Sequence, residues 1–367
     1  MNSSMVDWDL AVATGTRLVR PGPQVSVAEA REAVAQLRDH AAAAYEHVAG
    51  FTGLHASTEG ASVAVIDRPG WIRANAAGFQ TVLEPLVAKI QGQRPPSAVA
   101  TAVGARVTGM QTGSLLAFLA TKVLGQYELF PPYGESADAR PGRLLLVAPN
   151  IVATEREMHV EPRDFRLWVC LHEETHRVQF GGVPWLRGHV MSEIEAFVAA
   201  TDVDPTAIAR RLRSAAGAAY AAVRDGFDPD ASSEGGSLVE AVQTPEQREI
   251  LDRITALMSL LEGHADFVMD GVGPAVIPSV AEIRRKFQRR RKEAGRVEAV
   301  VRRLLGIDAK MRQYRDGERF VRAAVSRGGM AGFNRVWESP ANLPTKAELS
   351  APGDWVNRVV GLGELEV

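Results

Sequence analysis

The chain has 367 residues, of which 46% are hydrophobic and 23% charged, and its formal net charge is −2. This composition is typical of a folded globular protein and excludes a disordered or fibrous one, and the near-neutral charge gives no electrostatic reason to expect nucleic acid or an anionic membrane as a partner. A single cysteine, Cys170, excludes an intramolecular disulfide framework and a cysteine-based metal cluster.

The N-terminal stretch lacks the basic and apolar regions of a secretory signal. The longest apolar run, GSLLAFLATKVLG, is interrupted by Lys122 and is shorter than the roughly 20 residues that a membrane span requires. We therefore expect a reduced, cytoplasmic setting without a membrane partner.

Helical periodicity dominates the first part of the chain. A capping box formed by Ser26 and Glu29 predicts a helix that begins there and ends at Gly50. Residues 74–90 and 110–127 are predicted to be further helices, and the second is expected to be buried because it is strongly apolar. Residues 1–140 are thus expected to form an N-terminal helical region.

Residues 143–152, RLLLVAPNIV, are β-prone and bounded by turn residues, so we predict a strand there. A Gly-, Ser- and Asp-rich segment at about 225–240 predicts a flexible loop. We expect residues 141–340 to carry the functional site and residues 341–367 to form a C-terminal tail, unless all three regions make one compact domain.

The stretch WVCLHEETHRVQF, residues 168–180, lies in a helix predicted to begin at Pro162 and to end at the glycines 181 and 182. Its two histidines, His172 and His176, are one turn apart on a face with large apolar residues. Two neutral imidazoles in this arrangement can bind one zinc ion, and Glu173 can take a proton from water at the ion's open position. The alternative is a helix whose His and Glu side chains make solvated or capping contacts, but the apolar surroundings favour a metal site.

A catalytic zinc ion requires a third protein ligand and an open fourth position. In SLLEGHADFVMD, Glu262 and Asp266 lie one turn apart on one helical face, whereas His264 points elsewhere. Apolar residues flank Glu262 on both sides, and an unpaired acid in a buried helix is costly. Glu262 is therefore the favoured ligand, with Asp266 accepting the free ring N–H of a zinc histidine. His264 and His189 are the alternative third ligands.

Two other features of the sequence are less specific indicators of function. Tyr314 and His264 are candidate donors to the oxyanion of a hydrolytic reaction, although a packing or surface role is favoured for each. The basic run at residues 284–296 is interpreted as a solvated helix, because acidic residues neighbour it and the net charge is −2. A nucleic-acid- or anion-binding helical protein is the rival hypothesis that this run supports.

The residues His172, Glu173 and His176, followed by Glu262 and Asp266, resemble the gluzincin arrangement of zinc metallopeptidases. The segments HEETHRVQF, LEGHADFVMD and AKMRQYRDGERFV together resemble a bacterial family of zincin-like metallopeptidase homologues, which are described as hydrolases and are associated with deazaflavin-coenzyme biosynthesis genes. The resemblance spans roughly residues 5–340.

This resemblance implies a mainly α-helical zincin-like fold with a small β-sheet or edge strand, one zinc ion per chain and a peptide or protein substrate. In zincins, a strand that borders the cleft binds extended substrate, and the resemblance gives that role to residues 143–152. We therefore expect a zinc-dependent metallopeptidase in which Glu173 activates the zinc-bound water. The alternative is a zinc-containing protein that binds a peptide or partner without cleaving it.

Overall fold

Helices make up most of the structure, a computed structural model that describes residues 5–56, 62–93, 98–130, 142–201, 244–292 and 307–361. The helices before residue 201 are α1 (Trp8–Leu18), α2 (Val27–Thr52), α3 (Arg68–Gln93), α4 (Ala98–Leu119), α5 (Ala148–Met158), α6 (Pro162–Gly182) and α7 (Leu186–Ala199). Those that follow are α10 (Pro245–Val272), α11 (Val280–Lys292), α13 (Ile307–Asn334), α14 (Lys346–Ser350) and α15 (Pro352–Trp355), with single turns η1 (Arg335–Trp337), η2 (Pro340–Asn342) and η3 (Val356–Val360). The predicted mainly helical fold with a small sheet is confirmed, while the loop predicted at 225–240 lies outside the described residues.

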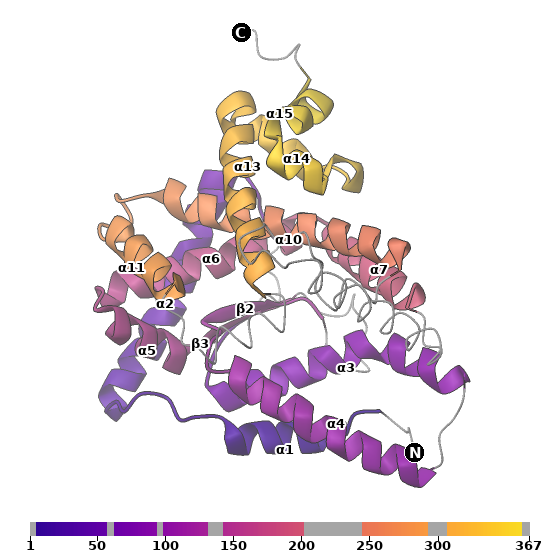
Figure 1. Cartoon of the computed structure of the whole chain (residues 1–367). Coiled ribbons are helices and arrows are strands. Elements are labelled where there is room, and N and C mark those ends of the chain that lie inside the picture. The colour runs from indigo at the N-terminus through magenta and orange to yellow at the C-terminus, as the bar shows by residue number, and fades with distance from the viewer. Residues whose placement is uncertain are drawn as a thin grey trace, which may run out of the picture.

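A small sheet separates two groups of helices. Its strands are β1 (Val63–Ile66), β2 (Gly125–Glu128) and β3 (Arg143–Val147), in the order β1-β3-β2, with β1 parallel and β2 antiparallel to β3. Helices α1, α3 and α4 lie on one side of the sheet in Figure 1, and α6, α10 and α7 lie on the other. The central strand β3 is therefore enclosed, and its residues Leu144 to Val147 are fully buried.

The strand predicted at residues 143–152 is half as long as expected, because α5 begins directly after Val147. Pro149 sits in the first turn of α5, where its missing N–H costs no helical hydrogen bond. Moreover, β3 pairs on both sides, so it has no free edge for a substrate. In the described sheet, β2 is an edge strand and β3 is the central strand. The prediction that residues 143–152 form an edge strand is therefore wrong.

The helix predicted at residues 110–127 is also wrong at its end, since α4 stops at Leu119 and β2 begins at Gly125. Pairing of β2 with β3 outweighs the helical periodicity of this stretch. Burial of α4 is only partial as well, because Met110 and Leu115 are 46% and 43% exposed.

Helix α2 begins as predicted. Ser26 Oγ accepts from the backbone N–H of Glu29 at 3.2 Å, and a Glu29 carboxylate oxygen accepts from the N–H of Ser26 at 2.7 Å. The helix continues through Gly50 and stops at Thr52, because Gly53 adopts the left-handed conformation with φ of 70°.

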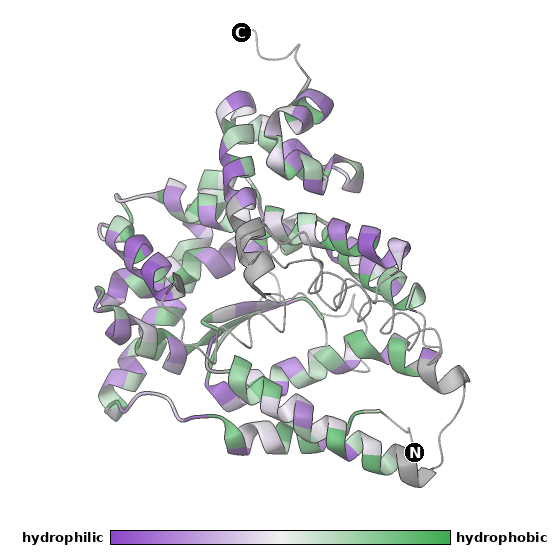
Figure 2. Ribbon diagram, in the orientation of Figure 1, coloured by the Kyte–Doolittle hydropathy of each residue, from purple (hydrophilic) through white to green (hydrophobic). Residues whose placement is uncertain are grey.

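Hydrophobic side chains form three clusters in the described residues. The first joins α2, α5, α6 and the end of α10, the second joins α10, α13 and the C-terminal helices, and the third joins α3, α4 and β3. Figure 2 shows the corresponding alternation of apolar and polar residues along each helix. Helix α10 contributes to two clusters, so its position is fixed from both ends. Among the described residues, none of the helices combines the length and apolar character that crossing a bilayer would need.

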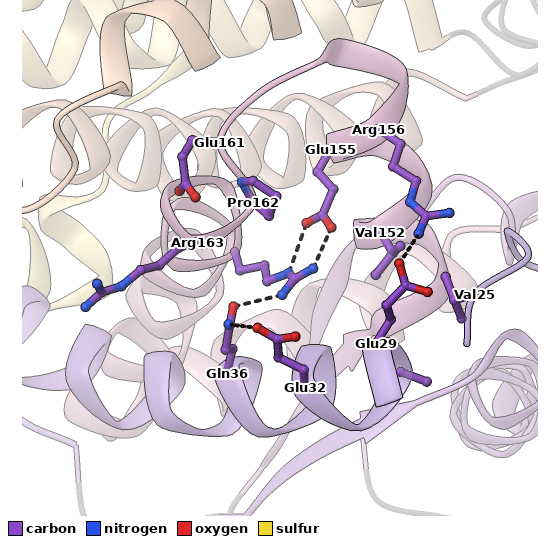
Figure 3. Close-up of a pocket in the computed structure, with 12 residues that line it drawn as sticks. Val25, Glu29, Glu32, Gln36, Val152, Glu155, Arg156, Glu161, Pro162 and Arg163 are labelled. Atoms are coloured by element: carbon purple, nitrogen blue, oxygen red, sulfur yellow. Dashed lines mark hydrogen bonds and ion pairs between the residues drawn. The ribbon is translucent and has the colours of Figure 1, made fainter. Parts of the chain in front are cut away.

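A polar hollow of about 370 Å³ lies between α2, α5 and α6 (Figure 3). Arg166 is one of the residues that line it, and its buried guanidinium donates two hydrogen bonds to the buried carboxylate of Glu155, at 3.0 and 2.6 Å, and one to Gln36 at 2.8 Å. A buried ion pair is tolerated only when its groups are paired in this way. The pair therefore fixes the start of α6 against α5 and α2.

Residues 340–361 form short helices that pack on α13. Trp355 is fully buried, and its ring lies edge-on to Phe320 at 5.3 Å between centroids. The boundaries predicted at residues 140 and 340 remain predictions, as does the cytoplasmic setting.

Candidate metal centre

Helix α6 carries both histidines of the predicted site. Its start is fixed locally by Pro162 in the first turn and by Glu161, whose carboxylate accepts from the backbone N–H of Asp164 at 2.7 Å. The helix is buried along most of its length by the first hydrophobic cluster. His172 and His176 therefore extend from a rigid element, one turn apart, as the sequence predicts.

Helix α10 brings the third residue to them. It begins with a capping box, in which Thr244 Oγ1 accepts a hydrogen bond from the backbone N–H of Gln247 at 3.1 Å. It crosses α13 where Gly263 meets Gly317, and a β-carbon on either glycine would overlap the backbone of the other helix. This close crossing fixes α10 immediately beside Glu262.

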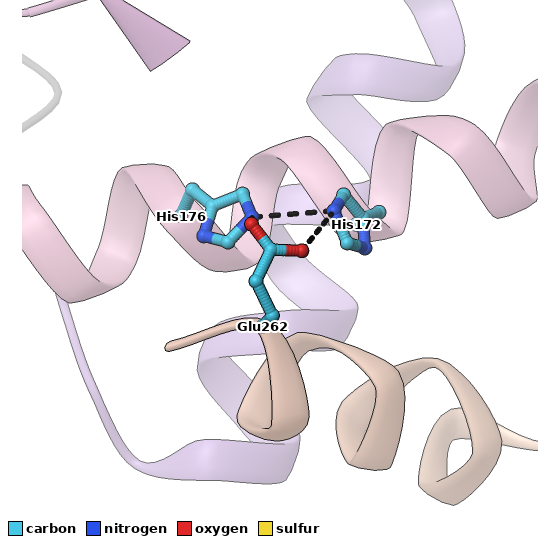
Figure 4. Close-up of side chains that lie close together, drawn as sticks. All are labelled: His172, His176 and Glu262. Atoms are coloured by element: carbon cyan, nitrogen blue, oxygen red, sulfur yellow. Dashed lines mark hydrogen bonds and ion pairs between the residues drawn. The ribbon is translucent and has the colours of Figure 1, made fainter. Parts of the chain in front are cut away.

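The side chains of His172, His176 and Glu262 point toward one another (Figure 4), and their ligand atoms all lie within 4.8 Å of each other. The two Nε2 atoms are 3.2 Å apart, and each lies 3.6 Å from an oxygen of Glu262. Ligand atoms bound at about 2.0–2.1 Å to a tetrahedral zinc ion are about 3.3 Å from one another. Two imidazole nitrogens and a carboxylate oxygen at these separations fit a zinc ion.

The cluster is also accessible. The side chains of His172 and Glu262 are 23% and 27% exposed, and that of His176 is 12% exposed. A site closed by protein on all sides would be structural, whereas an accessible site leaves a coordination position for solvent.

Glu173 lies beside the cluster and is almost completely buried. Burial, together with the negative charges of Glu262 and Glu174, raises the pKa of Glu173 well above its usual range. Its carboxyl group lies against β2: a β-carbon on Gly125 would be 2.6 Å from Cγ and Cδ of Glu173. Only glycine at position 125 leaves room for this carboxyl group below the strand.

Asp266 is predicted to accept a hydrogen bond from the ring of a zinc histidine. One of its carboxylate oxygens lies 3.8 Å from Nη2 of Arg284 on α11. The ring of His172 places its Nδ1 3.3 Å from the sulfur of Met269. The role predicted for Asp266 therefore remains a prediction.

The alternative ligands lie elsewhere. His264 is fully buried against the rings of Phe333 and Trp337, at 5.2 and 5.4 Å between centroids, and its Nδ1 lies 2.9 Å from the amide nitrogen of Gln179. Burial and the nearby His176 lower the pKa of His264 to about 3. His189 is on α7, with its ring 5.8 Å from that of Trp185. Neither belongs to the three-residue cluster among the described side chains.

Tyr314 falls within α13, but its side chain lies outside what the structure describes. The basic run is described only as far as residue 292. Within it, Arg284 pairs with Asp270 and Glu318, and Arg290 pairs with Glu157 at 2.9 Å. These arginines therefore contact acidic residues of the same chain.

The sequence predicted no functional role for three residues that lie near the centre: Gly125, Gly263 and Gln179. Gly125 lies near the end of the stretch predicted to be helical, where a glycine is unfavourable, and that is the one signal it offers. Gln179 shares the helical stripe of the two histidines, but its contacts depend on α10, which is about 80 residues away in sequence.

Comparisons with known proteins find a family and a solved structure that are similar to this chain. The sequence matches the zincin-like metallopeptidase family over residues 6–356. The fold is similar to the crystal structure of a protein from Chloroflexus aurantiacus that is provisionally described as a hydrolase with a novel fold. The TM-score is 0.68 and the sequence identity is 30%, and the similarity covers 98% of this chain and 100% of that chain. The comparison with curated proteins finds no match. The match over nearly the whole chain, together with the cluster of His172, His176 and Glu262, shows that this protein belongs to the zincin-like metallopeptidase family.

Proposed function

We propose that the protein is a zinc-dependent peptidase in which His172, His176 and Glu262 hold the metal ion and Glu173 is the general base. The observation that supports this proposal most directly is the accessible cluster of two imidazoles and a carboxylate with a second, buried carboxyl group beside it. A structural metal site has no need of such a base. Zinc, when bound, supplies Lewis acidity and lowers the pKa of a coordinated water to about 7.

The chain's own residues then move the proton. Glu173 accepts the proton of the attacking water and passes it to the nitrogen of the leaving amine. Its burial suits this task, because burial raises the pKa of the Glu173 carboxyl group well above its usual range and so favours transfer of a proton to it. Its carboxyl group occupies space beside β2 that a side chain at position 125 would fill.

A peptide is the proposed substrate because β2 is an edge strand of the described sheet and lies against Glu173. The N–H of Val147 donates to the carbonyl of Leu124 at 2.8 Å, which makes these residues a hydrogen-bonded pair of the antiparallel ladder. Because such pairs alternate, the backbone groups of Gly125 and Tyr127 turn away from β3. An extended peptide that paired with them would place its carbonyl groups near Glu173.

The proposal is tested with zinc-loaded protein and a library of unstructured peptides, with metal content measured on the same samples. We expect one zinc ion per chain in the wild type and in Glu173→Gln, and loss of zinc in His172→Ala. Cleavage should fall by about 10²–10⁴-fold in Glu173→Gln, which is the usual contribution of a general base.

Equal cleavage by the wild type and Glu173→Gln would show that Glu173 is not the base. Stoichiometric zinc without cleavage of any peptide would instead favour the alternative, a zinc-containing protein that binds a peptide or partner.

A further inference from the structure

Gln179 connects the two helices that carry the candidate metal ligands. It is fully buried on α6, and its side-chain amide lies within hydrogen-bond distance of three groups. Its Oε1 is 2.9 Å from Nδ1 of His176, and its Nε2 is 3.0 Å from the carbonyl oxygen of Leu261 and 2.9 Å from Nδ1 of His264. Leu261 directly precedes Glu262 in α10.

The chemistry of these partners fixes the direction of every hydrogen bond. The carbonyl of Leu261 can only accept, so the amide nitrogen of Gln179 must face it and the amide oxygen must face His176. That oxygen can only accept in turn, so His176 carries its ring proton on Nδ1. The same amide nitrogen donates to Nδ1 of His264, so the proton of His264 is on Nε2.

This arrangement determines which nitrogen of His176 can bind metal. With the proton on Nδ1, the lone pair is on Nε2, the atom that lies 3.2 Å from Nε2 of His172 and 3.6 Å from Glu262. The opposite tautomer would direct an N–H into the cluster and exclude a cation. Gln179 thus acts on two candidate ligands. It accepts the Nδ1 proton of His176, and it donates to the carbonyl of Leu261, the residue before Glu262.

We infer that Gln179 is a positioning residue that sets the tautomer of His176 and fixes the distance between α6 and α10 at the metal centre. The inference rests on the proposed zinc site, but the tautomer belongs to the metal-free protein and can be measured there. The competing interpretation is an ordinary buried amide that contributes to stability and has no effect on metal binding.

The first measurement is the ¹⁵N NMR spectrum of the histidine rings in the metal-free full-length protein, at a pH about two units above the usual imidazole pKa of about 6.5. We expect the proton of His176 on Nδ1 and that of His264 on Nε2. In Gln179→Glu, whose carboxylate can only accept, the proton of His176 should stay on Nδ1 and that of His264 should move to Nδ1. If Gln179 had only a structural role, the His264 proton would not be expected to move from Nε2 to Nδ1.

The second measurement is the zinc dissociation constant from a competition titration with a chromophoric chelator. Gln179→Met removes all three hydrogen bonds at similar volume and should weaken zinc binding by about 10–100-fold, which is typical for the loss of a group that orients a metal ligand. The matched control is Asn150→Leu. Asn150 is also a buried amide that donates to two carbonyls, at 2.8 and 2.6 Å, and accepts one hydrogen bond at 2.6 Å, from Arg68. The control should lose stability and retain zinc affinity.

A His176 proton on Nε2 in the wild type would overturn the inference, even if Gln179→Met fails to fold. Wild-type zinc affinity in a folded Gln179→Met variant would overturn it as well. If the wild type binds no zinc, the proposed function fails, whereas the NMR result still decides whether Gln179 sets the tautomer.

Discussion

Gly125 and Glu173 meet where β2 passes over α6, and a glycine at position 125 leaves the space that the carboxyl group of the proposed general base occupies. Tyr127, two residues along the strand, stacks on Phe180 of α6 at 6.0 Å between ring centroids. The strand is thus held close to the helix, and the Glu173 carboxyl group occupies the space where a β-carbon at position 125 would be. The position of the base therefore depends on a residue that has no functional group.

Replacing Gly125 with Ala should reduce peptide cleavage while leaving zinc bound. The added methyl group forces either β2 or the Glu173 carboxyl group to move, and a displacement of about 1 Å costs roughly 10² in rate. The measurements are zinc content and cleavage rate. Gly78→Ala is the control, because a β-carbon there meets no atom within 4 Å. Full activity in Gly125→Ala would mean that this contact does not hold Glu173.

At the scale of elements, the metal centre depends on how α6, α10 and α13 cross. Gly263 and Gly317 let α10 and α13 approach until their backbones touch, and Gly263 lies between Glu262 and His264. On its other side α10 meets α6 through Gln179 and the carbonyl of Leu261. The carboxylate of Glu262 is therefore placed by helix packing on two sides.

Gly263→Ala should both destabilise the protein and weaken zinc binding. The new methyl group separates α10 from α13, and overpacking of this kind costs about 1–3 kcal/mol in the free energy of unfolding. Urea denaturation and a zinc titration measure the two effects. Gly50→Ala is the control, since it lies within α2 with open space around it and should gain about 0.5–1 kcal/mol. A Gly263→Ala variant as stable as the control would contradict the tight crossing.

At the scale of the whole molecule, the candidate centre lies where two hydrophobic clusters meet. Helix α6 belongs mainly to the first cluster, and α10 contributes Leu260 and Leu261 to the second and Val268 to the first. A metal ion held by His172, His176 and Glu262 would link α6 to α10 across this boundary. Metal binding and global stability are therefore expected to be coupled.

Removal of zinc with a chelator should lower the thermal unfolding midpoint of the full-length protein. A ligand that binds only the folded state stabilises it by about 2.7 kcal/mol when its free concentration is 100 times its dissociation constant. The midpoint should rise again when zinc is restored. His172→Ala should unfold at the same temperature with and without zinc. A zinc-dependent shift that persists in this variant would place the ion elsewhere.

Local features of the fold and of the centre were predictable from the sequence because they depend on neighbouring residues. The 3.6-residue period places His172 and His176 on one face of α6, and the capping boxes at Ser26 and Thr244 mark where α2 and α10 begin. The flanking apolar residues also pointed to Glu262, which the structure brings to the two histidines.

Only the tertiary structure decided which strands lie at the edges of the described sheet, what occupies the space beside Gly125 and which atoms surround Gln179. Residues 143–152 looked like an edge strand, yet pairing on both sides encloses β3, and the stretch that looked like the end of a helix forms β2. The sequence by itself determined which residues are candidate ligands and which is the proposed base, because their types and local spacing suffice for it. Their convergence depends on contacts between residues about 80 positions apart, which arise from helix packing and leave no local pattern in the chain.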